Sequence, residues 1–261
     1  MDKERVLNAL SFDVEEWFVN TNLEKYITRS RWDSYDSRIE ESTALILSLL
    51  KEKKVLATFF VLGWVAQRHR ALIKEITRQG HEIATHGWSH ERIYKQTPEE
   101  FEAELKMSVE LLEDISGQKI LGHRAACLSI TAKSQWAIDI LIKNGIAYDS
   151  SIYPIIHDQY GIVNSPRFAY LLRQEGDKEL WEFPMSTFRL SKFNIPIAGG
   201  GYFRLYPYAL TSFFIKQLNR AGNPVMVYLH PPEFDLQQPK LKIDPKNKFR
   251  VYVGLKNNFA K

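Results

Sequence analysis

The sequence predicts an α/β fold built on a parallel sheet. Short apolar runs rich in β-branched and aromatic residues alternate along the chain with longer amphipathic segments, and Gly residues or turns separate them. Such alternation is typical of parallel sheets, because each helix returns the chain to the start of the next strand. With 261 residues, 44% of them hydrophobic, the chain can bury the core of one large domain.

Six segments are predicted as strands. The clearest is 55–62, in which residues 58–61 are β-branched or aromatic. The strands are expected, in order, at 6–12, 55–62, 82–85, 120–123, 147–150 and 225–229.

Five segments carry a helical pattern. The best-marked start is at Thr97, an N-cap that precedes Pro98 and an acidic first turn, and Gly117 marks the end of the same helix. The helices are expected at 38–51, 64–79, 97–115, 131–143 and 208–221. Between 151 and 203 the pattern loosens into an elaborated connection, whose glycine run 199–201 predicts a tight loop with its backbone close to a ligand or a neighbouring chain.

Composition excludes several classes of partner. The net charge is +4, but basic and acidic residues are interspersed, so nucleic acid is not implied. No apolar run is long enough to span a bilayer, which predicts no membrane partner. Residues 1–5 carry two acids, and the interrupted apolar run 6–12 after them is too short and too polar for a signal peptide. The single Cys127 excludes an internal disulfide. These features predict a cytoplasmic protein, and nothing in them indicates an oligomeric state.

Polar residues fall at or just after the ends of the predicted strands. In a parallel barrel or open sheet these ends share one face, where such folds place their active sites. Asp13 and Glu15 project to the same side of an extended segment and Glu16 to the other. The residues at the strand ends are Asp13, Glu15, His86, His90, Arg124, Asp149 and His230.

Two of these residues, His86 and His90, predict a metal site. A hydrolytic divalent ion takes about three imidazole or carboxylate ligands and keeps an open position. The acidic cluster at 13–16 supplies carboxylates for the remaining ligand. Cys127 has no base spaced to activate it and is expected to be a packed side chain.

Five segments in order carry a family resemblance. They are 12–15 (Phe-Asp-Val-Glu), 86–90 (His-Gly-Trp-Ser-His), 122–125 (Gly-His-Arg-Ala), 148–151 (Tyr-Asp-Ser-Ser) and 229–233 (Leu-His-Pro-Pro-Glu). Together they resemble the motifs of the polysaccharide deacetylases, the fourth carbohydrate esterase family. The segments 195–204 and 228–231 most resemble the branch found in exopolysaccharide gene clusters, which is close to the metal-independent allantoinase-like enzymes.

The resemblance implies a distorted (β/α) barrel with about seven parallel strands and an elaborated C-terminal half. It places one catalytic domain over 1–245 and leaves 246–261 as a tail of uncertain structure. The implied activity is N-deacetylation of N-acetylated amino sugars in a bacterial polysaccharide, by hydrolysis of a C–N bond that is not a peptide bond. An allantoinase-like amidohydrolase that opens a small cyclic amide, and a noncatalytic glycan-binding relative, stay open as alternatives.

The resemblance also implies a metal and a base. Glu15, His86 and His90 would bind a divalent ion, expected to be zinc. Asp13 would be the general base that takes a proton from water, and Arg124 would keep this carboxylate ionised and oriented.

The resemblance further implies a general acid, and two aromatic side chains are candidates for binding the sugar. His230 would protonate the departing amine, with Asp149 as its partner. Trp17 and Trp88 lie beside the expected ligands and are candidates for stacking on a sugar ring.

The chain departs from the family pattern at three places. Val14 and Glu15 replace the second of two adjacent aspartates, which lengthens the expected ligand. Residues 126–127 replace a proline that usually follows the alanine of the third motif. Pro232 stands where the exopolysaccharide branch tends to have tryptophan, which removes a flat surface for a sugar.

Overall fold

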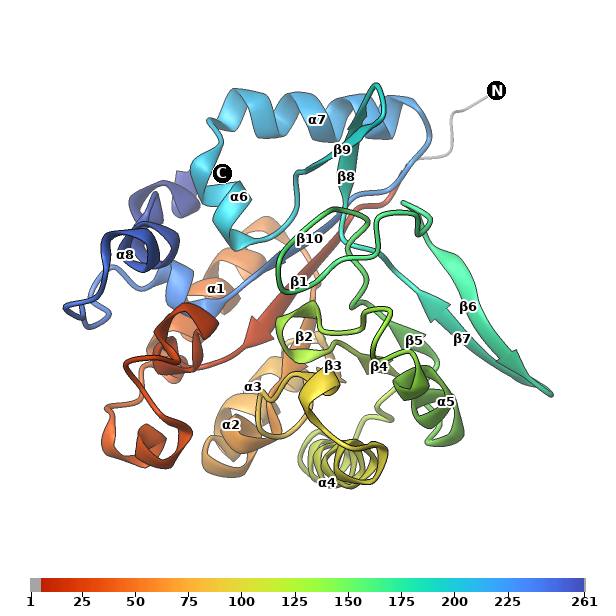
Figure 1. Cartoon of the computed structure of the whole chain (residues 1–261). Helices are drawn as coiled ribbons and strands as arrows, with labels where there is room; N and C mark the ends of the chain where they lie inside the picture. Colours follow the sequence, from red (N-terminus) through yellow and green to blue (C-terminus); the bar gives the residue numbers. More distant parts are fainter. Residues whose placement is uncertain (1–5, 261) are drawn as a thin grey trace.

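The structure, a computed structural model, describes residues 6–260, so the acids and bases at 1–5 lie outside the described residues. Its main element is an eight-stranded sheet that curls into a half-barrel (Figure 1). The strands in sheet order are β10 (Met226–Leu229), β1 (Ala9–Val14), β2 (Thr58–Val61), β3 (Glu82–Thr85), β4 (Gly122–His123), β5 (Tyr148–Asp149), β7 (Lys178–Glu182) and β6 (Tyr170–Glu175).

The α/β class and the parallel sheet are confirmed. Every neighbouring pair from β10 to β7 is parallel, and only the edge strand β6 runs antiparallel, to β7. These seven parallel strands match the number expected. The sequence did not mark β6, β7 or the two strands at 187–190 and 193–196, and all four lie inside the elaborated connection expected over 151–203.

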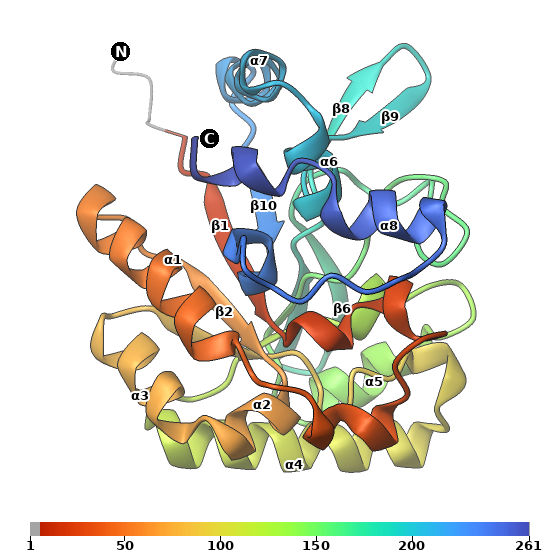
Figure 2. The ribbon, with the colours of Figure 1, turned by 90° about the vertical axis from the view of Figure 1, so that its left-hand side faces the viewer.

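Helices pack against the convex side of the sheet and over one end of it (Figures 1 and 2). They are α1 (Ile39–Lys53), α2 (Gly63–Arg68), α3 (Arg70–Arg78), α4 (Pro98–Ser116), α5 (Trp136–Lys143), α6 (Gly200–Leu205), α7 (Tyr208–Arg220) and α8 (Pro245–Tyr252). The helix expected over 64–79 is two helices, because His69 leaves helical geometry with φ −121° and ψ 48°.

The start of α4 is as the sequence predicts. The Thr97 hydroxyl accepts a hydrogen bond from the Glu100 backbone N–H, and the Glu100 carboxylate accepts one from the Thr97 N–H. Such a capping box stabilises a helix by about 1 kcal/mol. The helix ends at Gly117, whose φ of 67° is left-handed.

Successive side chains of β1 point alternately to the hydrophobic core and to the inside of the half-barrel. Phe12 points to the helix side, where its ring stacks on Phe59 at 5.2 Å and joins the main hydrophobic core. Ser11 and Asp13 point to the opposite side and contact Arg124. The inside of the half-barrel is therefore polar where the helix side is apolar.

The C-terminal half adds a hairpin and a helical tail to this sheet. The hairpin pairs β8 (Thr187–Leu190) with β9 (Phe193–Pro196). In the tail, α8 is tied to α6 by the buried Arg204, whose guanidinium donates to the carbonyls of residues 250, 251 and 253. Within residues 6–260, no helix combines the length and apolar character that crossing a bilayer requires.

Candidate active site

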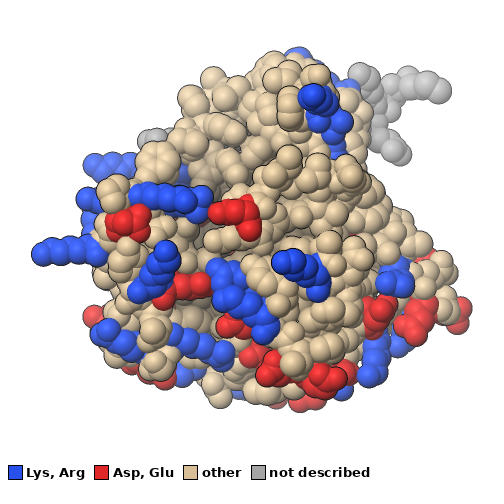
Figure 3. All heavy atoms as spheres, viewed as in Figure 1, with Lys and Arg blue, Asp and Glu red and all other residues tan. Residues whose placement is uncertain are grey.

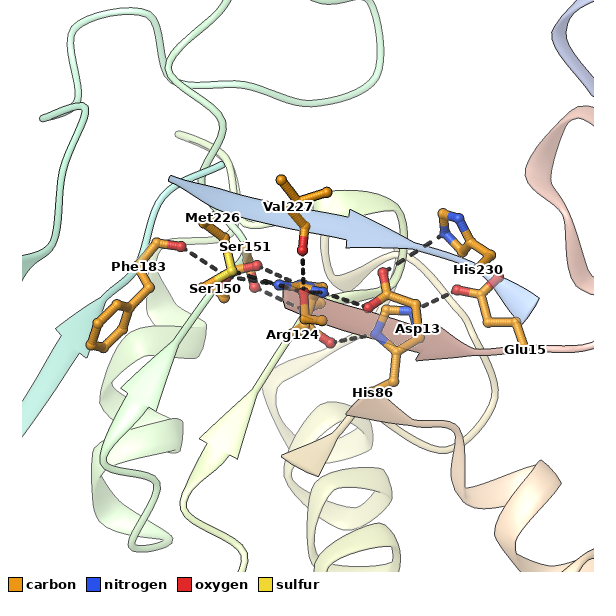
Figure 4. Close-up of polar contacts among 12 residues, drawn as sticks. Asp13, Glu15, His86, Arg124, Ser150, Ser151, Phe183, Met226, Val227 and His230 are labelled. Carbon is orange, nitrogen blue, oxygen red and sulfur yellow. Dashed lines mark hydrogen bonds and ion pairs between the residues drawn. The ribbon is translucent and has the colours of Figure 1, made fainter. Parts of the chain in front are cut away.

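The carboxyl ends of the parallel strands border a cavity of about 340 Å³. Asp13 lies near the end of β1, and Glu15, His86 and His230 directly follow β1, β3 and β10. Figure 4 shows these four side chains and Arg124 gathered on the inside of the sheet. The structure thus brings together residues that the sequence placed at separate strand ends.

Arg124 holds the carboxylate of Asp13. The arginine is fully buried, and its Nη1 donates to Asp13 Oδ1 at 2.6 Å and to Ser11 Oγ at 3.0 Å. Nε and Nη2 donate to the carbonyl and hydroxyl of Ser150, and the guanidinium carbon lies 3.9 Å from the centre of the Phe60 ring. These contacts fix Oδ1 of Asp13, whereas Oδ2 faces His230 at 3.8 Å.

Glu15, His86 and His90 form a compact donor set. Glu15 Oε1 lies 2.7 Å from His86 Nε2 and 3.0 Å from His90 Nε2, and all three side chains are at least nine-tenths buried. The ligand atoms of these residues lie within 4.8 Å of one another. His90 has a left-handed φ of 55°, a strained conformation of the kind that clusters at functional sites.

The hydrogen bonds of His86 test whether a cation fits this set. His86 Nδ1 lies 2.8 Å from the Arg124 carbonyl, which can only accept, so Nδ1 carries a proton. In a neutral imidazole, Nε2 then presents a lone pair to the Glu15 carboxylate oxygen. His86 Nε2 and Glu15 Oε1 would then be two acceptors only 2.7 Å apart. Such a pair requires either a cation bound by both atoms or a second proton on the His86 ring. The residues therefore fit a divalent ion, with the Arg124 carbonyl orienting the ligand ring.

The charges of the donor set support this fit. Burial raises the pKa of Glu15, but the charge of His90 and hydrogen bonds from both imidazoles outweigh it and hold that pKa well below its ordinary value. Burial lowers the pKa of His86, but the carboxylates of Asp13 and Glu15 outweigh this effect and raise it. Glu15 is thus an anionic oxygen ligand beside two imidazole nitrogens, which suits zinc.

His230 faces Asp13 across the cavity and is oriented by Glu233. The His230 Nδ1 lies 3.0 Å from Glu233 Oε1, which leaves Nε2 toward Asp13. Burial lowers the pKa of His230, but the hydrogen bond and charge of Glu233, with the charges of Glu15 and Asp13, outweigh it and raise the pKa to about 9. In the sequence analysis Glu233 belongs to a motif but has no assigned role. Its position three residues after His230, across a turn, is the sequence feature that could have indicated this pairing.

Replacing Glu233 by Gln should lower the pKa of His230 from about 9 toward the ordinary value of about 6.5. Because the folded pKa is the higher one, the ion pair stabilises the fold fully below about pH 6.5, and this stabilisation is lost as the pH rises through about 9. NMR titration of the His230 ring in the metal-free protein measures the shift. Glu110→Gln, on the exposed side of α4, is the control, and equal pKa values in both variants would contradict the assignment.

The glycine run 199–201 lets the backbone approach residues of this site. A Cβ on Gly200 would lie 1.5 Å from Glu233 Oε1, and one on Gly199 would lie 2.6 Å from the Tyr228 ring. Gly199 also has a left-handed φ of 96°. The run is not the tight loop expected, because Gly200 and Gly201 begin α6 after Gly199. Its close neighbours are side chains of the same chain, and Gly200 allows Glu233 to reach His230.

Gly200→Ala should lower kcat/KM by about 10²-fold, since the methyl group pushes Glu233 away from His230 and misplaces this expected proton donor. Gly201→Ala is a matched control, because a Cβ there meets nothing within 4 Å. Steady-state kinetics of the two variants measures the difference. Equal activities would show that the position of Glu233 does not matter.

Asp149 does not partner His230, contrary to the expectation. Its Oδ1 pairs with His123 Nδ1 at 2.7 Å and accepts from the Ser151 hydroxyl. His123, Asp149 and Glu182 are register partners on β4, β5 and β7, on the face opposite to Arg124. Burial, followed by the charge of Asp149, raises the pKa of Glu182 well above its ordinary value. Asp149 therefore belongs to a buried network behind the site.

The two tryptophans differ in position. Trp17 lines the cavity but is 4% exposed, and its Nε1 donates to the carbonyl of Asp36. Trp88 packs against Gly63, where a Cβ would lie 2.5 Å from its ring, and is not among the described residues that line the cavity. Cys127 also lines the cavity; its Sγ lies 2.8 Å from the Thr21 hydroxyl, and burial raises its pKa to about 12, so it is not a ready nucleophile.

Comparison with known proteins relates part of the chain to a described family. Residues 28–146 match the family model described as polysaccharide deacetylase. This part of the chain is similar to the polysaccharide deacetylases. It is 33% identical over 107 residues to the peptidoglycan deacetylase of Helicobacter pylori, an alignment that covers 41% of this chain and 36% of that protein. The chain thus spans about a third of the length of this curated relative.

Solved structures share the fold of this chain. A Mycobacterium smegmatis protein assigned to the polysaccharide deacetylases matches with a TM-score of 0.60 at 22% identity, over 87% of this chain and 78% of that one. PuuE allantoinase matches with a TM-score of 0.57 at 18% identity over the same shares. These similarities bear on the fold and confirm the distorted (β/α) barrel.

The candidate site draws on three parts of the chain. His86, His90 and Arg124 lie within the matched 28–146, and Asp13 and Glu15 precede it. Residues 150–261 match a second model, described as a domain of unknown function (DUF3473). This part supplies His230, Glu233 and the strand β10 that pairs with β1.

Proposed function

We propose that the chain hydrolyses the acetamide bond of N-acetylated amino sugars in a bacterial polysaccharide. The observation that carries the proposal is a base and an acid facing each other beside a metal donor set. Asp13 Oδ2 and His230 Nε2 lie 3.8 Å apart at the wall of one cavity, next to Glu15. The matched family model and the Helicobacter pylori relative support a glycan as the substrate.

The chain's own residues account for the two proton transfers. Asp13, held through Oδ1 by Arg124, has Oδ2 free to take a proton from the attacking water. The oxygen of that water bonds to the acetyl carbon. His230 then gives its Nε2 proton to the nitrogen as the C–N bond breaks, which yields acetate and the free amine. Glu233 holds His230 in position for this step.

The metal site belongs to the proposal. Glu15, His86 and His90 would hold a divalent ion, which we propose to be zinc. Such an ion supplies Lewis-acid polarisation of the acetyl carbonyl and of the attacking water. Asp13, Glu15 and His230 form a second set whose atoms lie within 4.8 Å, but His230 is engaged by Glu233 and Asp13 by Arg124. We therefore assign the ion to the first set.

Acetate release tests the proposal. The zinc-loaded protein should release acetate from N-acetylated chito-oligosaccharides, and mass spectrometry should show the matching free amines. His230→Ala should lower kcat by about 10²- to 10⁴-fold because the leaving amine loses its proton donor. His69→Gln, at the junction of α2 and α3 outside the donor set, should leave the rate unchanged. Hydrolysis of allantoin without acetate release from any glycan would contradict the proposal.

A further inference from the structure

An acid-free segment forms one end of the molecule. No Asp or Glu occurs among residues 183–232, so all 31 acids of the chain lie elsewhere. The segment contains the hairpin β8–β9 and the helices α6 and α7, which lie together at the top of Figures 1 and 2. The space-filling view shows no acidic side chain at this end, whereas acids gather lower on the same face (Figure 3).

The hairpin presents an apolar face that continues beyond the protein body. Leu190 and Phe193 are register partners, and alternation puts them on the same face as Phe188. The Phe188 ring packs against Phe214 of α7 at 4.8 Å. Leu190 and Phe193 lie further toward the tip and are 58% and 61% exposed. The inner part of this face therefore covers α7, and its outer part is uncovered.

The helix α7 extends the same apolar surface. Phe213 contacts Phe188 of the hairpin at 6.1 Å between ring centres and is still 47% exposed. Leu210, one turn earlier on the same side of the helix, is also exposed. Large apolar side chains gathered in this way mark an interaction surface rather than scattered surface residues.

Basic side chains surround the apolar ones. Arg189, Lys192, Lys216 and Arg220 are exposed, and none forms an ion pair with an acid in the part of the chain that the structure describes. Lys192 sits at the hairpin turn with its Nζ 5.5 Å from the centre of the Phe193 ring. We call the exposed residues Leu190, Lys192, Phe193, Leu210, Phe213 and Lys216 the β8–α7 face.

We propose that the β8–α7 face binds the surface of an anionic lipid bilayer. Aromatic and aliphatic side chains inserted at the headgroup level, with Lys and Arg beside them, are the features of peripheral membrane contacts. A symmetric dimer formed through this face would place Lys192 and Lys216 of one copy against the basic side chains of the other. Repulsion between these like charges disfavours such a dimer.

One exposed residue of the acid-free segment reaches the cavity. Leu205, at the end of α6, is 49% exposed and lines the cavity next to the acid-free surface. The lack of a membrane-spanning segment led us to expect no membrane partner. A protein that binds the bilayer surface does not require such a segment.

Vesicle co-sedimentation at low salt tests the proposal. The full chain should bind vesicles of phosphatidylcholine with about one-third phosphatidylglycerol, bind pure phosphatidylcholine far more weakly, and lose most binding in high salt. The double variant Leu190→Ser/Phe193→Ser should lower the partition coefficient at least about tenfold. Leu45→Ser/Met107→Ser, at exposed positions of α1 and α4, is the matched control and should bind like the unmodified chain.

A double charge-reversal variant measures how much the lysines contribute to vesicle binding, apart from the apolar side chains. Lys192→Glu/Lys216→Glu should also lower binding to the anionic vesicles at least about tenfold, and Lys74→Glu/Lys133→Glu, at exposed lysines elsewhere, should not. Thermal unfolding of each variant, expected to be unchanged, keeps a folding defect from imitating lost binding.

Two outcomes would overturn the proposal. One is equal binding, or none, to vesicles with and without phosphatidylglycerol. The other is a dimer in sedimentation velocity that Leu190→Ser/Phe193→Ser converts to monomer, since a second copy would then cover the face. Because no step of this test uses deacetylation, its outcome is independent of the proposed function.

Discussion

Asp13→Asn should lower kcat by about 10²- to 10⁴-fold and leave the fold intact. An asparagine still offers an oxygen to Arg124 Nη1, which now lies 2.6 Å from Asp13 Oδ1. It cannot take a proton from water, so the buried contacts survive while the base is lost. The measurement is acetate release by the zinc-loaded variant together with its thermal unfolding midpoint.

The control for Asp13→Asn is an aspartate away from the cavity. Asp139 on α5 is exposed and pairs only with the half-exposed Arg173 among the described ion pairs. Asp139→Asn should therefore keep full activity. If Asp13→Asn also kept full activity with an unchanged midpoint, Asp13 would not be the base.

Arg124→Leu should destabilise the fold by about 3–5 kcal/mol. The change leaves the buried Asp13 carboxylate without its cation and removes the donors to Ser150 and Ser11. In Arg124→Leu/Asp13→Leu, no buried charge is left unpaired, so much of the lost stability should return while activity does not. Urea unfolding of the two single variants and the double variant measures this coupling.

Arg173→Leu is the control for Arg124→Leu. Its guanidinium is 46% exposed and forms a surface ion pair with Asp139, so its loss should cost less than about 1 kcal/mol. If Arg124→Leu cost no more than Arg173→Leu, the buried pair would not organise the inside of the sheet.

Much of the site could be predicted because parallel strands deliver their ends to one edge. Asp13, Glu15 and His230 follow from that rule and from alternation along an extended segment. The partner of His230 did not follow, because β5 has only two residues and its ends do not reveal which face Asp149 takes. The register with His123 decides that face, and register is not visible in a single sequence.

The features that we did not predict from the sequence depend on contacts between residues far apart along the chain. The strand β7 lies between Pro and Gly residues in a connection without regular period, and it forms because β5 offers it a free edge. The single helix expected over 64–79 divides at His69, whose ring contacts Glu40 and Ser37 near the start of α1. Glu233 gains its role from the approach of Gly200, far from it along the chain.

Anomalous diffraction at the zinc edge, from crystals grown with zinc and acetate, tests the central claim most directly. The account predicts one strong peak about 2.0–2.2 Å from His86 Nε2, His90 Nε2 and a Glu15 oxygen, with acetate between that peak and His230. A peak at other residues, or none at these three when zinc is in excess, would contradict it.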